Sequence, residues 1–65
     1  MRRLREWLND TETTQIELAR RMDVSQPTVS DWINDESKPS IDNLIKLSEI
    51  TRLSIDALVR ETDAA

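Results

Sequence analysis

The segment TQIELARRMDVSQPTVSDWIN, from Thr14 to Asn34, decides the fold of this chain. Its apolar residues recur at helical spacing in two short runs, and a polar turn separates them. Thr14 and Glu17 have the spacing of a capping box, in which each side chain bonds to the backbone N–H of the other residue. Ser25 is a favourable N-cap, and Pro27 falls in the first turn that would follow it. The segment therefore predicts two helices, over 15–22 and 26–34.

The residues around the turn allow the two helices to cross closely. Ala19 is small enough for a close crossing. Asp23 stands where the first helix should end in a left-handed conformation, which Asp tolerates better than most residues. Val24 should fill the core beneath the turn, and Val29 and Trp32 should face inward. Four side chains then lie on the opposite face of the second helix: Gln26, Pro27, Ser30 and Asp31.

Several residues of this segment resemble the Cro and lambda-type phage repressors, also called the XRE-type helix-turn-helix family. They are Gln15, Ala19, Val24, Ser25, Val29, Ser30 and Trp32. The resemblance continues through Lys38-Pro39-Ser40, the IDNLIKLSEI segment (41–50) and the segment from Ser54 to Val59, so it covers nearly the whole chain. It implies an all-α, compact, five-helix fold of the lambda-repressor type. Its helix-turn-helix, at about residues 15–34, would present its second helix to the DNA major groove.

The rest of the sequence predicts three more helices in one domain, residues 1–65. Their expected ranges are Arg2–Asn9, Ile41–Ile50 with Ser40 as its cap, and Ile55–Arg60 with Ser54 as its cap; a polar loop covers Asp35–Pro39. Arg52, like Asp23, stands where related sequences usually carry glycine. We therefore expect both to be left-handed, at a cost on the order of 1 kcal/mol each.

Four large apolar residues need separate interpretation. Trp7 and Trp32 could stack on single-stranded nucleic acid, but their helical spacing favours packing in the core. Ile16 and Ile33 fall near the surface of the two central helices. They are either partly buried at a contact with a neighbouring helix or part of a protein-contact patch.

The composition excludes several classes of protein. The 65 residues contain no cysteine, histidine or glycine, so the sequence predicts no disulfide, no thiolate metal site and no glycine-rich phosphate loop. We expect no enzyme activity, no cofactor and no small-molecule ligand. The apolar runs are too short to cross a membrane, and the basic N-terminus lacks the apolar stretch of a signal peptide. The expected location is the cytoplasm of a bacterial host, in association with the nucleoid.

The charge balance opposes DNA binding. The net charge is −4, whereas nucleic-acid-binding proteins usually present a basic face. Arg2, Arg3 and Arg5 cluster at the N-terminus, as a solvated face or as a phosphate contact. Asp35 and Glu36 should repel phosphates. We therefore expect weak non-specific binding and a shallow dependence on salt.

Four residues are candidates for contacts to DNA bases, each with an ordinary structural alternative. Gln26 is an exposed helix residue that can bond bidentately to adenine. Pro27 starts a helix, and the resemblance implies contact with a thymine methyl group. Ser30 either contacts a base or is merely small enough to let the helix sit deep. Asp31 can accept from cytosine N4, although it repels the DNA backbone.

A second set of residues is predicted to contact phosphates. The resemblance implies that Gln15 contacts a phosphate and braces Gln26; the alternative is a solvated residue. Thr14 caps its helix in either case and can also reach a phosphate. The remaining candidates are Asn34, Lys38 and, more weakly, Thr28, which should face the DNA backbone.

These observations favour a sequence-specific, double-stranded-DNA-binding transcription regulator, such as a Cro-like phage or prophage repressor. One recognition helix reads few base pairs, so we expect a homodimer on a palindromic operator, weak without DNA. Ile55 and Val59 are the interface candidates, and Leu58 should belong to the core. One alternative is a protein-interaction module of the same fold, such as an antitoxin or adaptor. Another is the excised N-terminal domain of a larger repressor.

Overall fold

The chain is all-α, as predicted, in the computed structural model, which describes residues 1–63 and the side chains of residues 1–60. Within that range there are five helices and no strand. The helices are α1 (Arg2–Thr11), α2 (Gln15–Met22), α3 (Gln26–Ile33), α4 (Ile41–Thr51) and α5 (Ile55–Asp63). Helix α2 has the predicted bounds. Helix α1 continues two residues beyond the predicted end, α4 one and α5 three, whereas α3 ends one residue earlier, with Asn34 as its C-cap.

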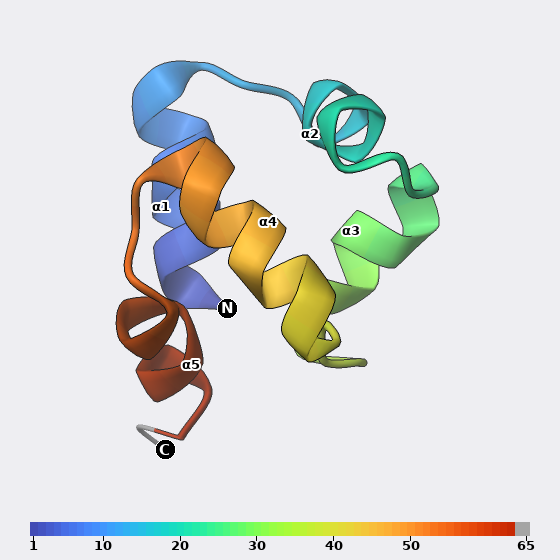
Figure 1. Cartoon of the computed structure of the whole chain (residues 1–65). Coiled ribbons are helices and arrows are strands. Elements are labelled where there is room, and N and C mark those ends of the chain that lie inside the picture. The colour runs from blue at the N-terminus through green and yellow to red at the C-terminus, as the bar shows by residue number, and fades with distance from the viewer. Residues whose placement is uncertain (64–65) are drawn as a thin grey trace.

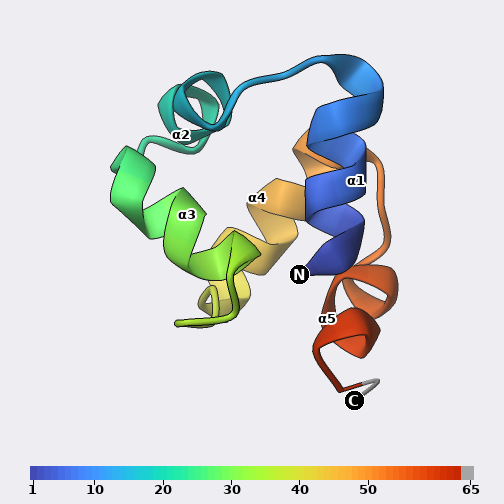
Figure 2. The same cartoon turned by 180° about the vertical axis from the view of Figure 1, so that it is seen from behind.

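The five helices form two groups joined by α4. Helices α1 and α5 pack together on one side, and α2 and α3 form the crossed pair on the other (Figure 1). Helix α4 contacts both α5 and α2, and α1 also contacts α3. Seen from behind, the N-terminus lies between α1 and the end of α3 (Figure 2). The crossed pair α2 and α3 is therefore supported from two sides.

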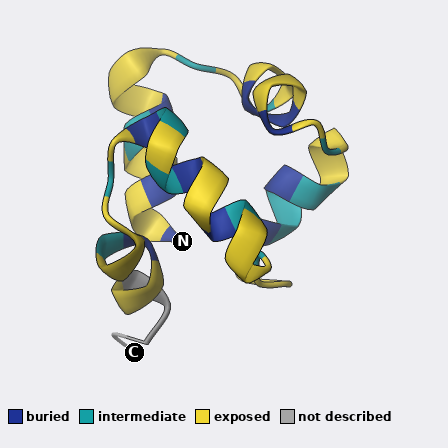
Figure 3. Cartoon of the chain, in the orientation of Figure 1, coloured by how far each residue is buried: buried dark blue, intermediate teal, exposed yellow. Residues whose placement is uncertain are grey.

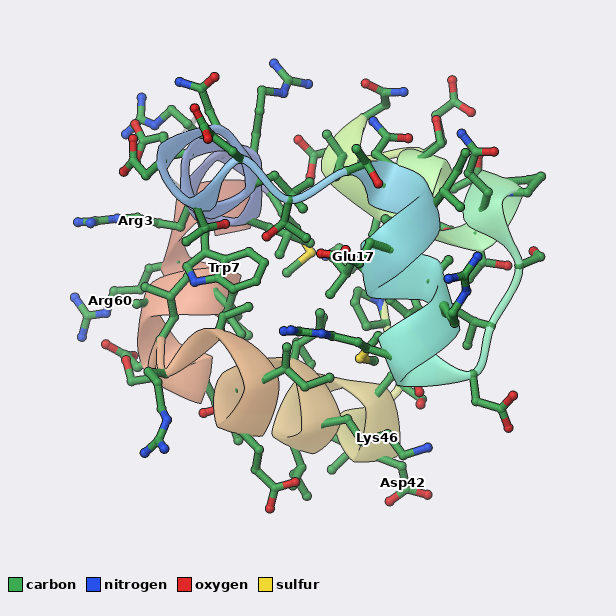
Figure 4. All side chains as sticks on the ribbon, turned by 90° about the horizontal axis from the view of Figure 1, so that it is seen from above. Arg3, Trp7, Glu17, Asp42, Lys46 and Arg60 are labelled. Carbon is green, nitrogen blue, oxygen red and sulfur yellow. The ribbon has the colours of Figure 1, made fainter. Side chains whose placement is uncertain are left out.

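A single apolar core lies where the helices converge. Figure 3 shows buried residues on the inner faces of the helices and exposed residues on their outer faces. Trp32 is buried, and Trp7 is half-buried against the core, so both pack as predicted. Trp7 points from α1 toward the side where α4 and α5 lie (Figure 4). The buried hydrophobic residues are Met1, Leu4, Leu8, Leu18, Ala19, Met22, Val29, Trp32, Ile33, Leu44, Leu47 and Leu58.

The predicted N-caps are present. The Thr14 hydroxyl accepts from the Glu17 N–H at 3.1 Å, which is one of the two bonds of the predicted capping box. Ser25, Ser40 and Ser54 accept in the same way from the backbone N–H three residues later, at 3.3, 3.2 and 3.0 Å. These local bonds explain why the starts of α2 to α5 could be predicted to the residue.

Helices α1, α2 and α4 each end at a residue with positive φ, and α3 does so one residue after its C-cap. The predicted pair, Asp23 (φ 59) and Arg52 (φ 65), is confirmed. Glu12 (φ 56) and Asp35 (φ 60) adopt the same conformation and were not predicted. The chain has no glycine, so charged residues occupy these four left-handed positions. Glycine would avoid the steric penalty of this conformation, because it has no Cβ.

Ile33 follows the first of its two predicted interpretations, burial at a contact with a neighbouring helix. The burial is more complete than predicted, because the residue is only 4% exposed. The reason is tertiary: α1 packs against α3 and covers the last turn of that helix. Ile16 is 55% exposed, as predicted.

Candidate nucleic-acid interface

Helix α3 separates an apolar inner face from a polar outer face. Val29 and Trp32 are buried, which fixes how the helix is rotated about its axis. Its first two residues, Gln26 and Pro27, are exposed, and Ser30 and Asp31 are half-buried. The four predicted base-contact residues therefore retain access to solvent, beginning at the N-terminal turn. Docked helix-turn-helix proteins use the N-terminal residues of this helix to contact base edges.

An open groove of about 640 Å³ runs between α1, the start of α2 and the end of α3. Three of the predicted phosphate contacts, Thr14, Gln15 and Asn34, line it together. Gln15 is half-buried, whereas Thr14 and Asn34 are exposed. The complete lining is Arg5, Leu8, Asn9, Glu12, Thr13, Thr14, Gln15, Ile33 and Asn34.

The electrostatics of the groove are mixed. The first turn of α2 has backbone N–H groups without intrahelical partners, and the positive end of the helix dipole favours an anion there. Arg5 adds a positive charge on the opposite wall. Glu12 is exposed and lines the groove with a negative charge, and Glu17 lies in the first turn of α2. Attraction for a phosphate is therefore local and stays modest.

The C-terminus of α3 is held by two cationic groups from the first turn of the chain. The ammonium group of Met1 donates to the carbonyls of Trp32 (3.4 Å) and Ile33 (3.3 Å) and lies 2.6 Å from Asp35 Oδ1. Arg5 Nη2 donates to the same Ile33 carbonyl at 3.3 Å. Cations at the end of a helix bond to its free carbonyls and complement its dipole. At least one residue of the basic N-terminal cluster, Arg5, therefore stabilises the C-terminal end of α3.

This role of Arg5 was not predicted from the sequence. The contact joins residues 28 and 29 positions apart, and no local pattern links them. The available signal was indirect: Arg5 follows Leu4 on a helix whose apolar face must meet another helix, so a side chain at its edge can reach across. The sequence does not show which helices α1 packs against, and the structure shows that α3 is one of them.

The other predicted contacts lie outside the groove. Thr28 is half-buried at the start of α3, and its hydroxyl lies 2.8 Å from Ser25 Oγ. Lys38 is exposed and lines a separate pocket of about 120 Å³. That pocket also contains Val59, one of the two predicted dimer residues. Val59 and Ile55 are 37% and 40% exposed, so each can contact a partner, and Leu58 is fully buried as predicted.

A helix-turn-helix family model matches residues 1–58, which include α1 to α4 and the start of α5. The chain belongs to the helix-turn-helix family. It is similar to a Haemophilus influenzae protein named "Uncharacterized HTH-type transcriptional regulator", with 38% identity over 53 residues. The match covers 82% of this chain but 22% of that relative, so the chain spans about a fifth of the relative's length. No solved structure gave a significant match.

The crossed pair α2 and α3 lies within the matched residues, and Asp23 and Val24 lie in the turn that joins the two helices. The resemblance noted from the sequence is thus confirmed at the level of the family. Its finer part, a Cro-like phage repressor, stays a prediction. In the part of the chain that the structure describes, no helix has both the length and the apolar character needed to cross a bilayer.

Proposed function

We propose that this helix-turn-helix domain binds double-stranded DNA sequence-specifically and regulates transcription, in the manner of a Cro-like phage or prophage repressor. The observation that carries the proposal is the orientation of α3. Its buried side is fixed by Val29 and Trp32, and its N-terminal residues Gln26 and Pro27 are exposed. A helix held in this way can enter the major groove without rearrangement of the core.

The base contacts follow from the chemistry of the exposed face. The Gln26 amide has a donor and an acceptor that match adenine N6 and N7. Pro27 presents an apolar ring to a thymine methyl group, and Asp31 accepts from cytosine N4. Ser30 lies between them on the helix and contacts a base through its hydroxyl. A carboxylate at Asp31 also excludes bases that present only acceptors, so it contributes to specificity even where its contact is weak.

The phosphate contacts hold the helix at one register. Thr14, Gln15 and Asn34 line one groove, and the N-terminus of α2 at its edge favours a backbone phosphate. Thr28 and Lys38 would contact phosphates on either side of it. Contacts of this kind position the protein and carry no sequence information.

The proposed DNA-bound form is a homodimer on a palindromic operator. Two recognition helices related by a two-fold axis would meet half-sites about 34 Å apart. Ile55 and Val59 on α5 are the proposed self-contacts, because they are exposed next to the buried Leu58. The proposed regulatory mechanism is occlusion, in which the bound dimer blocks polymerase at an overlapping promoter.

One observation favours a second candidate, a protein-interaction module such as an antitoxin or adaptor. The net charge is −4, and Asp31 and Glu36 lie at the end of α3 beside Asp35, whose charge the Met1 ammonium group compensates. A basic protein partner would suit that surface better than a phosphate backbone. A third candidate is the N-terminal domain of a larger repressor, because the chain spans about a fifth of its relative's length.

Binding-site selection from a random duplex library, with the purified chain at low salt, distinguishes the first two candidates. Enrichment of a palindrome with half-sites one helical turn apart would support the dimeric DNA-binding proposal. Enrichment of a single half-site would support DNA binding by a monomer. No enrichment, from a protein with a cooperative thermal transition, would overturn the proposal in favour of a protein partner.

A further inference from the structure

Three side chains form a hydrogen-bonded chain from α1 to the outer face of α3. Arg5 Nη2 donates to Asn34 Oδ1 at 3.3 Å. The Asn34 amide nitrogen, Nδ2, donates in turn to Ser30 Oγ at 3.4 Å. Arg5 is also anchored by its bond to the Ile33 carbonyl. We call these three residues the Arg5 relay: Arg5, Asn34 and Ser30.

The relay determines which way the Asn34 amide points. An arginine guanidinium can only donate, so the group that faces it must be the carbonyl oxygen of the amide. The Nδ2 group is then directed away from Arg5, toward Ser30. Without Arg5, either end of the amide could face Ser30, and the hydroxyl would meet a donor in one orientation and an acceptor in the other.

The relay also determines whether Ser30 can act as a hydrogen-bond donor toward another molecule. A serine within a helix commonly donates its proton to the carbonyl four residues earlier. Here the hydrogen bond shown for Ser30 Oγ is the one it accepts from Asn34. Its own O–H therefore stays available as a donor at the half-buried, outer face of α3.

We propose that Arg5 is a positioning residue for base recognition, acting through Asn34 to present Ser30 as a hydrogen-bond donor in the major groove. This inference rests on the proposed DNA-binding function. A donor matches guanine O6 and N7, adenine N7 and thymine O4, whereas cytosine presents only its N4 amino group there. At the base pair that Ser30 meets, the protein should therefore disfavour cytosine on the contacted strand. The second N–H of the Asn34 amide is still free to contact a phosphate.

The first test examines the relay in the free protein. In ¹⁵N-labelled protein, the Asn34 side-chain amide should give two well-separated proton signals. Arg5→Met should shift them toward values typical of a solvated amide, and Ser30→Ala should shift mainly one of them. Arg60→Met is the matched control, because it removes the same side chain from α5, where Arg60 pairs with Asp56. Unchanged Asn34 signals in Arg5→Met would overturn the relay without any reference to DNA.

The second test measures base preference on a selected site, as the ratio of affinities for the best base and for cytosine at each position. Ser30→Ala should reduce that ratio at one position from about fivefold to about one. Arg5→Met should reduce it at the same position and add nothing in the Ser30→Ala background. Arg5→Lys retains a hydrogen-bond donor, so the affinity ratio should fall only partly. In Arg60→Met the ratio should equal that of the wild type.

Asn34→Asp supplies the sharpest comparison. The new carboxylate keeps a partner for Arg5 but only accepts, so Ser30 must donate to it and offer a lone pair to the base. The base preference at that position should then shift toward cytosine. The added negative charge should lower the affinity for all DNA sequences alike. If Arg5→Met lowers the affinity for all DNA sequences equally, Arg5 contacts a phosphate and the inference is overturned. Failure of the wild type to select any site would contradict the proposed function, whereas the amide signals would still decide the relay.

Discussion

At the scale of single residues, the outer face of α3 combines groups that should have opposite effects on the proposed binding to DNA. The Gln26 amide is neutral and exposed at the first turn, so a base contact through it brings no charge near the phosphates. Asp31 brings a full negative charge one turn later. Because the two side chains differ in charge, substitutions at these positions separate base recognition from backbone repulsion.

We predict that Gln26→Ala lowers the affinity for the selected operator by about 1–3 kcal/mol, because a bidentate base contact is lost. Binding to unrelated DNA should hardly change, since the phosphate contacts remain. Fluorescence anisotropy titrations with both duplexes measure the two affinities. An equal loss on both duplexes would contradict the assignment of Gln26 to a base.

We predict the opposite pattern for Asp31→Asn. Removal of a negative charge near the backbone should raise the affinity for unrelated DNA roughly two- to fivefold at low salt, and the gain should disappear at high salt. Preference for one base of the half-site should fall at the same time. Titrations at two salt concentrations test both effects, with Asp42→Asn on the outer face of α4 (Figure 4) as the control. A gain of the same size in that control would assign the effect to net charge alone.

At the scale of helices, α1, α2 and α3 end in closely similar ways. The Asp23 N–H bonds to the Arg20 carbonyl at 3.2 Å, and the Val24 N–H bonds to the Ala19 carbonyl at 3.0 Å. This is the Schellman pattern, and the half-buried Val24 supplies the apolar contact that accompanies it. Arg52 ends α4 with a single bond to the Ser48 carbonyl at 2.8 Å. Each end requires a left-handed residue, and none of them is glycine.

We predict that Arg52→Gly stabilises the domain by about 1 kcal/mol, because glycine removes the steric penalty of the left-handed conformation. In a domain of this size that corresponds to a rise in Tm of roughly 4–8 °C. Asp23→Gly should give a smaller gain, since Asp tolerates this conformation better than Arg. Thermal unfolding followed by circular dichroism measures both changes. Arg52→Ala removes the same side chain but keeps a Cβ, and a similar gain from it would refute the backbone explanation.

At the scale of the whole molecule, the proposed DNA contacts and the proposed self-contact surface lie mostly on different helices and meet at Lys38. The groove lies between α1, α2 and α3, whereas Ile55 and Val59 lie on α5. Lys38 and Val59 line one pocket, so the loop before α4 lies next to the proposed interface. Dimer formation could therefore alter the position of the Lys38 loop.

We predict that Ile55→Asp and Val59→Asp each weaken self-association at least tenfold, because a charge would replace an exposed apolar contact. Sedimentation equilibrium without DNA, over a range of protein concentrations, measures the effect. Ile16→Asp is the matched control, since Ile16 is 55% exposed on α2. If all three variants associate like the wild type, the interface lies elsewhere.

The sequence determined the local features of this protein. The five helices, the caps at Ser25, Ser40 and Ser54, and the left-handed residues Asp23 and Arg52 follow from interactions within a few positions of the chain. The inner face of α3 follows equally from the spacing of Val29 and Trp32. These features could be predicted because their free energies depend on neighbours that the sequence itself places close together.

Only the tertiary structure decided the contacts between distant segments. It buried Ile33 beneath α1, bonded the Met1 ammonium group to the end of α3, and joined Arg5 to Asn34. These contacts depend on how two helices cross, which is set by the packing of the whole core and not by any local pattern. For the same reason, the sequence indicated which side chains could touch DNA, whereas the fold decided which of them line one groove.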